Sequence, residues 1–197
     1  SPDGKIAVAV HSSAGGISVI DLDKMALVKI MQTGARPSYA VFGANGKRFY
    51  ISNAGADMVS EIDTDNWSVI RELAVGKEPD HIVLSPDHTM MYTANVGDGT
   101  VSVINLSSGK LVNTYSVGKE PHGLDLSGDG LWLFVSSKGA GTFVRIDLMK
   151  GETKTVELQP APYHVAYINA LQKLYVSSRA APKIWIIDPV TMNVRGE

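Results

Sequence analysis

Short runs of apolar residues, separated by turn-forming residues, predict β-strands along the whole chain. The clearest example is residues 100–106, where apolar and polar positions alternate with a period of two, as in a half-buried strand. Clusters of glycine, proline, serine and aspartate bound each run and predict tight turns. One unit of the pattern contains four such runs, at residues 81–84, 90–95, 100–106 and 111–117.

This four-strand unit repeats at a nearly constant step. The third run recurs as ISVIDL, VSEIDT, VSVINL, FVRIDL and IWIIDP, and these start at residues 17, 59, 101, 143 and 184, which are steps of 42, 42, 42 and 41. A proline before the first run keeps the same register, at Pro37, Pro79, Pro121 and Pro162. Four short strands in a repeat of this length predict an all-β fold, a β-propeller of four-stranded antiparallel blades.

The turn between the first and second strands carries a recurring Asn-Gly or Asp-Gly pair, at Asp3-Gly4, Asn45-Gly46 and Asp129-Gly130. Such pairs supply the positive φ angles that a tight hairpin requires. His88 stands where the glycine would be, so we expect it to be an exposed turn residue. The Asp or Asn that ends each third strand is likewise interpreted as a turn former rather than as part of a carboxylate site.

The second strand, Tyr50-Ile51-Ser52-Asn53 and Tyr92-Thr93-Ala94-Asn95, follows a G-x-x-P opening and a turn of the S-P-D-G type. Together with the V-S-V-I-N-L strand these motifs resemble the YVTN family of β-propeller repeats, which are WD40-like in architecture. The pattern is also similar to the propeller that holds haem d1 in cytochrome cd1 nitrite reductases. The resemblance implies a secreted, periplasmic or cell-surface protein. It weakens in the last unit, where Asn169-Ala170-Leu171 replaces the turn motif and predicts a different turn.

The repeats predict one propeller domain over residues 1–197, with blade boundaries near residues 36, 78, 120 and 161. Because the opening unit lacks its first strand, the chain covers about 4.75 blades. We expect it to belong to a ring of seven or eight blades, with the remaining blades outside this segment, because a propeller must close to protect its strand edges. The alternative is a five-bladed ring with an incomplete first blade.

Composition narrows the possible functions. The net charge is −2 and no basic run is present, so nucleic-acid binding is not expected. The chain has no cysteine, which excludes disulfides, thiolate chemistry and a C-x-x-C-H haem attachment within these residues. No apolar run is long enough to predict a membrane span.

Candidate binding residues follow each repeated proline. The first strand of a propeller blade lines the central channel, so side chains just after these prolines should meet at one mouth of the channel. Loops after the second strands should add basic residues to the same face. The predicted ligand-binding set is therefore Tyr39, Asp80, His81, His122, Lys138, Tyr163, His164 and Arg179.

Two interpretations of this set remain open. It can form a polar, partly basic pocket for a metal, a haem-like macrocycle or an anionic ligand. Alternatively, the imidazoles fill contacts between blades and bind the backbone. A metal site is disfavoured because His122 lies one residue after its proline whereas His81 and His164 lie two residues after theirs, which predicts different depths.

No catalytic motif accompanies the repeat: the chain has no G-x-S-x-G, H-E-x-x-H or P-loop sequence. We therefore predict no catalytic residues and no cofactor, and a non-catalytic extracytoplasmic module that binds a protein or a surface polymer. The alternative is a propeller that binds a haem d1-like macrocycle for electron transfer or nitrite reductase-related chemistry. A small-molecule lyase or hydrolase is a third hypothesis, because fold alone does not decide function.

Overall fold

A computed structural model describes all residues from Ser1 to Glu197, and it is all-β apart from one 3-10 turn. The strands form five antiparallel sheets, each made of consecutive strands. The first sheet has three strands, β1 (Ile6–His11), β2 (Gly16–Asp21) and β3 (Ala26–Gln32). The second contains β4 (Pro37–Phe42), β5 (Arg48–Asn53), β6 (Met58–Asp63) and β7 (Ser68–Ala74).

The third sheet contains β8 (Pro79–Leu84), β9 (Met90–Asn95), β10 (Thr100–Asn105) and β11 (Lys110–Ser116). The fourth contains β12 (Pro121–Leu126), β13 (Trp132–Ser137), β14 (Thr142–Asp147) and β15 (Thr153–Glu157). The fifth contains β16 (Pro162–Ile168), β17 (Lys173–Ser178), β18 (Ile184–Ile187) and β19 (Val194–Gly196). The predicted four-stranded antiparallel blade is therefore confirmed, and the first sheet lacks the innermost strand of its unit.

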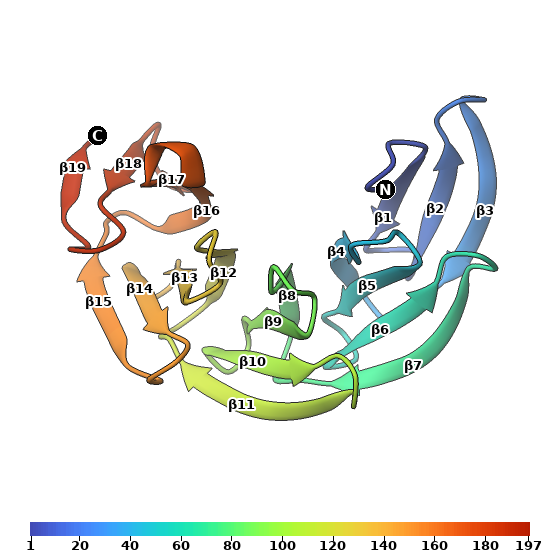
Figure 1. Cartoon of the computed structure of the whole chain (residues 1–197), viewed down its shortest axis with the longest axis horizontal. Helices are drawn as coiled ribbons and strands as arrows, with labels where there is room; N and C mark the ends of the chain where they lie inside the picture. Colours follow the sequence, from blue (N-terminus) through green and yellow to red (C-terminus); the bar gives the residue numbers. More distant parts are fainter.

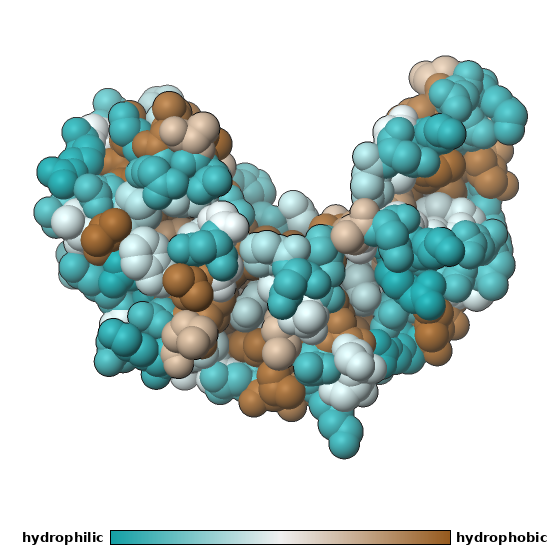
Figure 2. Space-filling model, in the orientation of Figure 1, coloured by the Kyte–Doolittle hydropathy of each residue, from teal (hydrophilic) through white to brown (hydrophobic).

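The five sheets are arranged as blades around an open arc (Figure 1). We call β4, β8, β12 and β16 the inner strands, because they lie on the concave side, while β7, β11 and β15 lie on the convex side. The first and last sheets stand at opposite ends of the arc, and the space-filling view shows the same open outline (Figure 2). By itself the chain therefore does not form the closed five-bladed ring that the sequence left open.

Apolar side chains pack between the blades. Each of the four hydrophobic clusters of buried residues joins two neighbouring sheets, and the largest spans the third and fourth sheets. In that cluster Val101 and Val103 of β10 pack with Leu133 and Val135 of β13, all nearly or fully buried. This packing follows from the period-two pattern, because alternate side chains of each strand face the neighbouring blade.

The turns that follow the inner strands are built alike. In the third sheet the Ser85 carbonyl accepts the His88 N–H, and Asp87 accepts the N–H of Thr89 at 3.1 Å. His88 has a φ of +54°, in the region that Gly4, Gly46 and Gly130 occupy in the other units. The structure thus places His88 as an exposed turn residue, as predicted. In the fifth sheet a 3-10 turn (Asn169–Leu171) replaces this geometry.

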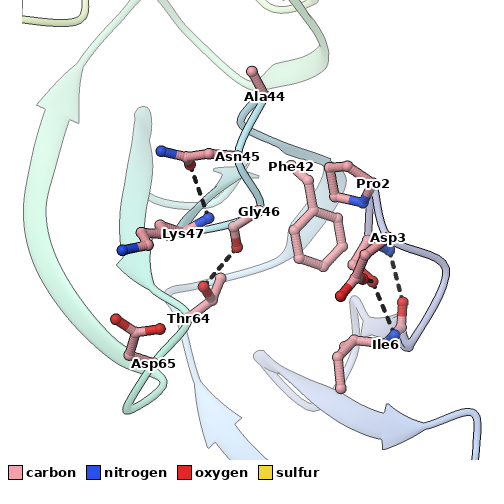
Figure 3. A pocket seen from close by; sticks show the side chains of 11 residues that line it. Pro2, Asp3, Ile6, Phe42, Ala44, Asn45, Gly46, Lys47, Thr64 and Asp65 are labelled. Atoms are coloured by element: carbon pink, nitrogen blue, oxygen red, sulfur yellow. Dashed lines mark hydrogen bonds between the residues drawn. The ribbon is translucent and has the colours of Figure 1, made fainter.

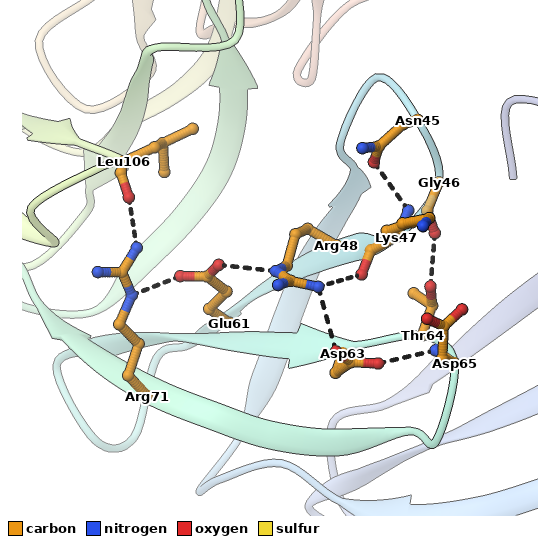
Figure 4. A network of polar contacts seen from close by, with 10 residues as sticks. All are labelled: Asn45, Gly46, Lys47, Arg48, Glu61, Asp63, Thr64, Asp65, Arg71 and Leu106. Carbon is orange, nitrogen blue, oxygen red and sulfur yellow. Dashed lines mark hydrogen bonds and ion pairs between the residues drawn. The ribbon is translucent and has the colours of Figure 1, made fainter.

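A charged network across β5, β6 and β7 links the second blade to the third (Figure 4). Glu61 of β6 is 5% exposed and pairs with Arg71 of β7 at 2.5 Å and with Arg48 of β5 at 3.4 Å. Arg71 also donates to the carbonyl of Leu106 in the next blade. Because a buried carboxylate requires partners, this network is a structural link between blades rather than a free site.

Candidate functional site

The candidate site forms where the inner strands begin. The residue before each inner-strand proline has a positive φ, at Arg36, Glu78, Glu120 and Ala161. The carbonyl of each of these residues accepts the N–H of the residue that follows the second strand, for example Val96 N–H to Glu78 at 3.1 Å. This repeated bend brings the loop after the second strand close to the start of the inner strand in each of the four blades.

A β-bulge follows each of these prolines. In β4, Pro37 pairs with Asn53 and Ala40 with Ile51, so Ser38 and Tyr39 together oppose one residue of β5. The same shift occurs at residues 80 and 81 of β8, 122 and 123 of β12, and 163 and 164 of β16. A bulge re-aims consecutive side chains that a regular strand would send to opposite faces. The predicted site residues of the inner strands therefore all lie on bulges.

The first bulge positions make a continuous chain of contacts across four blades. Ser38 donates to one carboxylate oxygen of Asp80, and the other oxygen lies 2.6 Å from Nδ1 of His122. The His122 ring stacks on Tyr163, with centroids 3.8 Å apart and planes within 10°. Arg179, just after β17, donates to the Tyr163 hydroxyl at 2.6 Å. We call these five residues together with Tyr39, His81 and His164 the mouth cluster.

Asp80 stays ionised within this chain. Burial alone would raise the pKa of its carboxyl group, but hydrogen bonds from His122 and Ser38 outweigh burial and hold that pKa below its usual value. Each oxygen has a partner, and the contact with Nδ1 lets Asp80 orient the His122 ring.

His81 occupies the second bulge position of β8 and is 7% exposed. Its Nδ1 accepts the N–H of Leu124 from the next blade at 3.3 Å, and its ring lies 3.9 Å from the ring of Tyr39. Burial, reinforced by the neighbouring His122, lowers the pKa of His81 to about 4. His81 is therefore neutral at pH 7, with its proton on Nε2.

The three predicted histidines do meet. The ring centroids are separated by 6.3 Å for His81 and His122, 6.0 Å for His81 and His164, and 5.1 Å for His122 and His164. Gly123, the second bulge residue of β12, lies where the fourth and fifth blades approach each other closely. A Cβ there would overlap the Tyr163 carbonyl and approach Val165 N to 2.9 Å.

The expectation of different depths is therefore wrong, because the bulges bring the first and second positions together. No group of three or more His, Asp or Glu side chains is arranged to hold a metal ion. His81 also presents a protonated Nε2, which is a hydrogen-bond donor and not a ligand.

The two basic residues of the predicted set differ. Arg179 contacts the cluster through Tyr163, with its guanidinium carbon 4.8 Å from the ring centroid. Lys138 instead forms an ion pair with Glu120 at 2.9 Å, which lowers the pKa of Glu120. The structure thus brings seven of the eight predicted residues into one group and holds Lys138 to its own blade's carboxylate.

A family comparison agrees with the propeller fold. The model of the YNCE-like β-propeller family matches residues 6–187, which is most of the chain. The chain belongs to the YNCE-like β-propeller family. No match was found among curated proteins.

Solved structures share the fold of this YNCE-like propeller at low sequence identity. Hydrazine synthase from Kuenenia stuttgartiensis is 22% identical with a TM-score of 0.86, over 98% of this chain and 63% of that one. The dihydro-haem d1 dehydrogenase NirN, in complex with DHE, is 15% identical with a TM-score of 0.80, over 100% of this chain and 44% of that one. The chain thus spans less than two thirds of the length of these two proteins.

One member of the mouth cluster and two neighbouring residues were not predicted from the sequence as site residues. Ser38 holds Asp80, and its position after Pro37, equivalent to that of Asp80 after Pro79, is a usable signal. Gly123 acts through the absence of a side chain, which only the spacing of the strands reveals. Asp125 of β12 accepts the N–H of Tyr167 at 2.7 Å, and burial raises the pKa of its carboxyl group.

The YNCE-like propeller also has a cavity outside the mouth cluster, between the first two sheets (Figure 3). It has a volume of about 530 Å³ and lies at the turns, where Phe42, Asn45 and Lys47 face Pro2 and Asp3. None of the eight predicted residues lines this cavity. The structure has no helix that is long and apolar enough to cross a membrane.

Proposed function

We propose that this YNCE-like propeller is a non-catalytic binding module that acts outside the cytoplasm and holds a protein or a surface polymer on its mouth cluster. The observation that carries the proposal is the chain of contacts from Ser38 to Arg179, which links four blades into one surface. Apart from Arg179, these residues lie on strands rather than on free loops, so their geometry is fixed before a partner arrives.

The side chains on this surface suit recognition. Tyr39 is 37% exposed, and His164 and Arg179 are also exposed. Tyrosine and arginine supply much of the binding energy of protein interfaces, because each combines a large apolar area with a polar end. The cluster is therefore a small anchor region, around which further contacts from the blade loops add area.

The proposal includes a complete ring. The five sheets leave an open arc, and further blades of the same kind would cover the flanks of the first and last sheets. The share of hydrazine synthase that the chain covers, 63%, supports a ring of seven or eight blades, since about 4.75 blades divided by 0.63 gives about 7.5. Mass and scattering measurements on the full-length protein would test the blade number.

Partner capture tests the binding role. The full-length protein, fractionated and purified from its source, should be found outside the cytoplasm with a bound partner that crosslinks to the mouth cluster. The double variant His164→Ala with Arg179→Ala should lose that partner, whereas His88→Ala, at the opposite ends of the strands, should keep it. Retention of the partner by the double variant, or a turnover that depends on the cluster, would contradict the proposal.

A second candidate function is binding of a haem d1-like macrocycle, and one observation favours it. His164 is exposed and neither of its ring nitrogens has a hydrogen-bond partner in the chain, so it suits an axial ligand. The neighbour NirN was solved with DHE bound. The native protein would then absorb visible light, and His164→Ala would remove or shift the band. A spectrum with protein absorption alone would reject this candidate.

A further inference from the structure

The mouth cluster has more hydrogen-bond donors without a partner than acceptors without a partner. His81 uses Nδ1 to accept the N–H of Leu124, so its proton resides on Nε2 and remains available to donate. His81 is not fully covered, and no group of the chain accepts from Nε2. It therefore offers a neutral donor that persists at physiological pH.

The mouth cluster has one carboxylate, Asp80, and each of its oxygens already has a partner. Asp80 accepts from Ser38 through one oxygen and from Nδ1 of His122 through the other. Because Nδ1 of His122 contacts Asp80, Nε2 is the ring nitrogen of His122 that remains free. Nε2 donates a hydrogen bond whenever the imidazole is protonated. Asp80 and the stacked Tyr163 ring hold His122 in one orientation, so the free nitrogen points in a fixed direction.

Tyr163 and Arg179 add two further kinds of donor. Arg179 donates to the Tyr163 oxygen at 2.6 Å, so the phenol proton is directed elsewhere. The guanidinium has five N–H groups, and the tyrosine is the only hydrogen-bond partner of this one. His164 lies 4.6 Å from Tyr163 and 5.1 Å from His122 by ring centroids, with both ring nitrogens unpaired.

We propose that the mouth cluster binds an anionic oxygen group, a carboxylate or a phosphate, between Arg179, Tyr163 and the three histidines, and takes up a proton as it does so. This inference rests on the proposed function and names the chemistry of the ligand. Donors from three inner strands and one loop converge here, and the one acidic side chain in contact with them has both oxygens engaged. An anion supplies the acceptors that the group lacks.

The proton uptake follows from the groups that face His164. Burial and the charge of a protonated His122 lower the pKa of His164, and Asp80 partly opposes this effect. His81 is neutral, so the charged groups that face His164 are Asp80 and Arg179, together with His122 whenever its ring is protonated. An anion bound beside His164 offsets the repulsion from His122 and favours the protonated ring. By linkage, the anion then binds more tightly as pH falls.

The test uses the full-length protein and two separate probes, inorganic phosphate and acetate, with nuclear magnetic resonance of the histidine rings as the readout. We expect at least one probe to shift the His122 and His164 signals in a saturable way, with about fivefold tighter binding at pH 5.5 than at pH 7.5. The probe that binds more tightly identifies the class of anion. No saturable shift with either probe overturns the inference.

Three variants locate the site. His164→Gln keeps a polar side chain but cannot titrate, so it should remove most of the pH dependence. Arg179→Ala should weaken binding about tenfold at every pH, because it removes a charged donor. His88→Gln, at the opposite turn, should bind like the unchanged protein. Equal effects of His88→Gln and His164→Gln would overturn the site assignment.

Partner capture separates this inference from the proposed function. If the double variant His164→Ala with Arg179→Ala loses the native partner but neither probe binds to the protein, the binding role is supported and the anion site is rejected. If the probes bind but no partner depends on the cluster, the anion site stands and the scaffold role fails. Both results are read from the same protein preparations.

Discussion

The two ends of the inner strands differ in what the repeat holds constant. At the turn that follows each of the first three inner strands, or precedes β1, the same backbone recurs: Gly4, Gly46, His88 and Gly130 all have a φ between +54° and +72°. At the mouth the bulge recurs, but its side chains are different in every blade. The first positions are Ser38, Asp80, His122 and Tyr163, and the second are Tyr39, His81, Gly123 and His164.

This difference separates the scaffold from the site. The turn must satisfy one backbone geometry, so few residues fit and the same types return in each unit. The bulge sets a direction but leaves the side chain free, so each blade contributes a different group and the four groups interact as a set. The predictions that follow test whether the mouth tolerates changes of size and charge less well than the turns do.

The largest effect is expected at Gly123. Alanine there would place a Cβ against the Tyr163 carbonyl and 2.8 Å from Oγ of Ser136, so the fourth and fifth blades must separate. We expect a loss of about 3 kcal/mol in the free energy of unfolding, measured with denaturant.

Gly151, in the turn after β14, is the matched control. It has a φ of +75° and nothing within 4 Å of an added Cβ, so alanine there should cost about 1 kcal/mol from backbone strain alone. If the two substitutions cost the same, close approach of the blades at Gly123 is not what the mouth requires.

The second effect is a pH dependence from His81. Its pKa is about 4 in the folded protein and near 6.5 in the unfolded chain, so the unfolded chain binds more protons between these values. The stabilisation is complete above pH 6.5 and is lost as pH falls toward 4, by about 2 to 3 kcal/mol at pH 4.5.

The variant His81→Asn cannot titrate at this position. It should reduce the slope of the free energy of unfolding against pH, as read from unfolding curves at pH 7 and pH 4.5. His88→Asn, in an exposed turn, should leave the slope unchanged. A slope that survives in His81→Asn would mean that another group, and not this imidazole, is buried in its neutral form.

The third effect concerns the charged network around Glu61, on β5, β6 and β7. Arg71→Ala leaves Glu61 with Arg48 as its single charged partner and removes the hydrogen bond to Leu106 of the next blade. Since Glu61 is buried while Arg71 is partly exposed, we expect a loss of about 2 kcal/mol in thermal or denaturant unfolding. Lys24→Ala, which breaks the exposed pair with Asp21, should change stability by less than about 0.5 kcal/mol.

The same contrast explains what the sequence could predict. The repeat, the strands and the turns depend on local patterns, and all of them were expected, including the exposed position of His88 and the changed turn at Asn169–Leu171. The meeting of His81, His122 and His164 was predicted from their place after the prolines, but their relative depth was not. A bulge is a relation between two strands, so one strand's sequence does not reveal it.

Pairings across blades were beyond sequence reasoning for a similar reason. Asp80 and His122 are 42 positions apart, and their contact depends on how two blades pack. The pairing of Lys138 with Glu120 also depends on the bend before Pro121, where Glu120 adopts a φ of +52°. Residue type and register bring such groups near one another, and the packing decides which ones pair.

The smallest effect is a gain in stability at the turn. His88 adopts a φ of +54°, which is strained for a residue with a side chain, and the equivalent positions of the other units hold glycine. His88→Gly removes that strain but makes the unfolded chain more flexible, so the net gain should be about 0.5 to 1 kcal/mol. His11→Gly, in strand β1, provides the control and should destabilise, because it adds flexibility to the unfolded chain and removes the contact of the imidazole with Ser18 at 2.8 Å. A loss of stability in His88→Gly would mean that its imidazole makes contacts which matter more than the backbone, and the turn would then resemble the mouth.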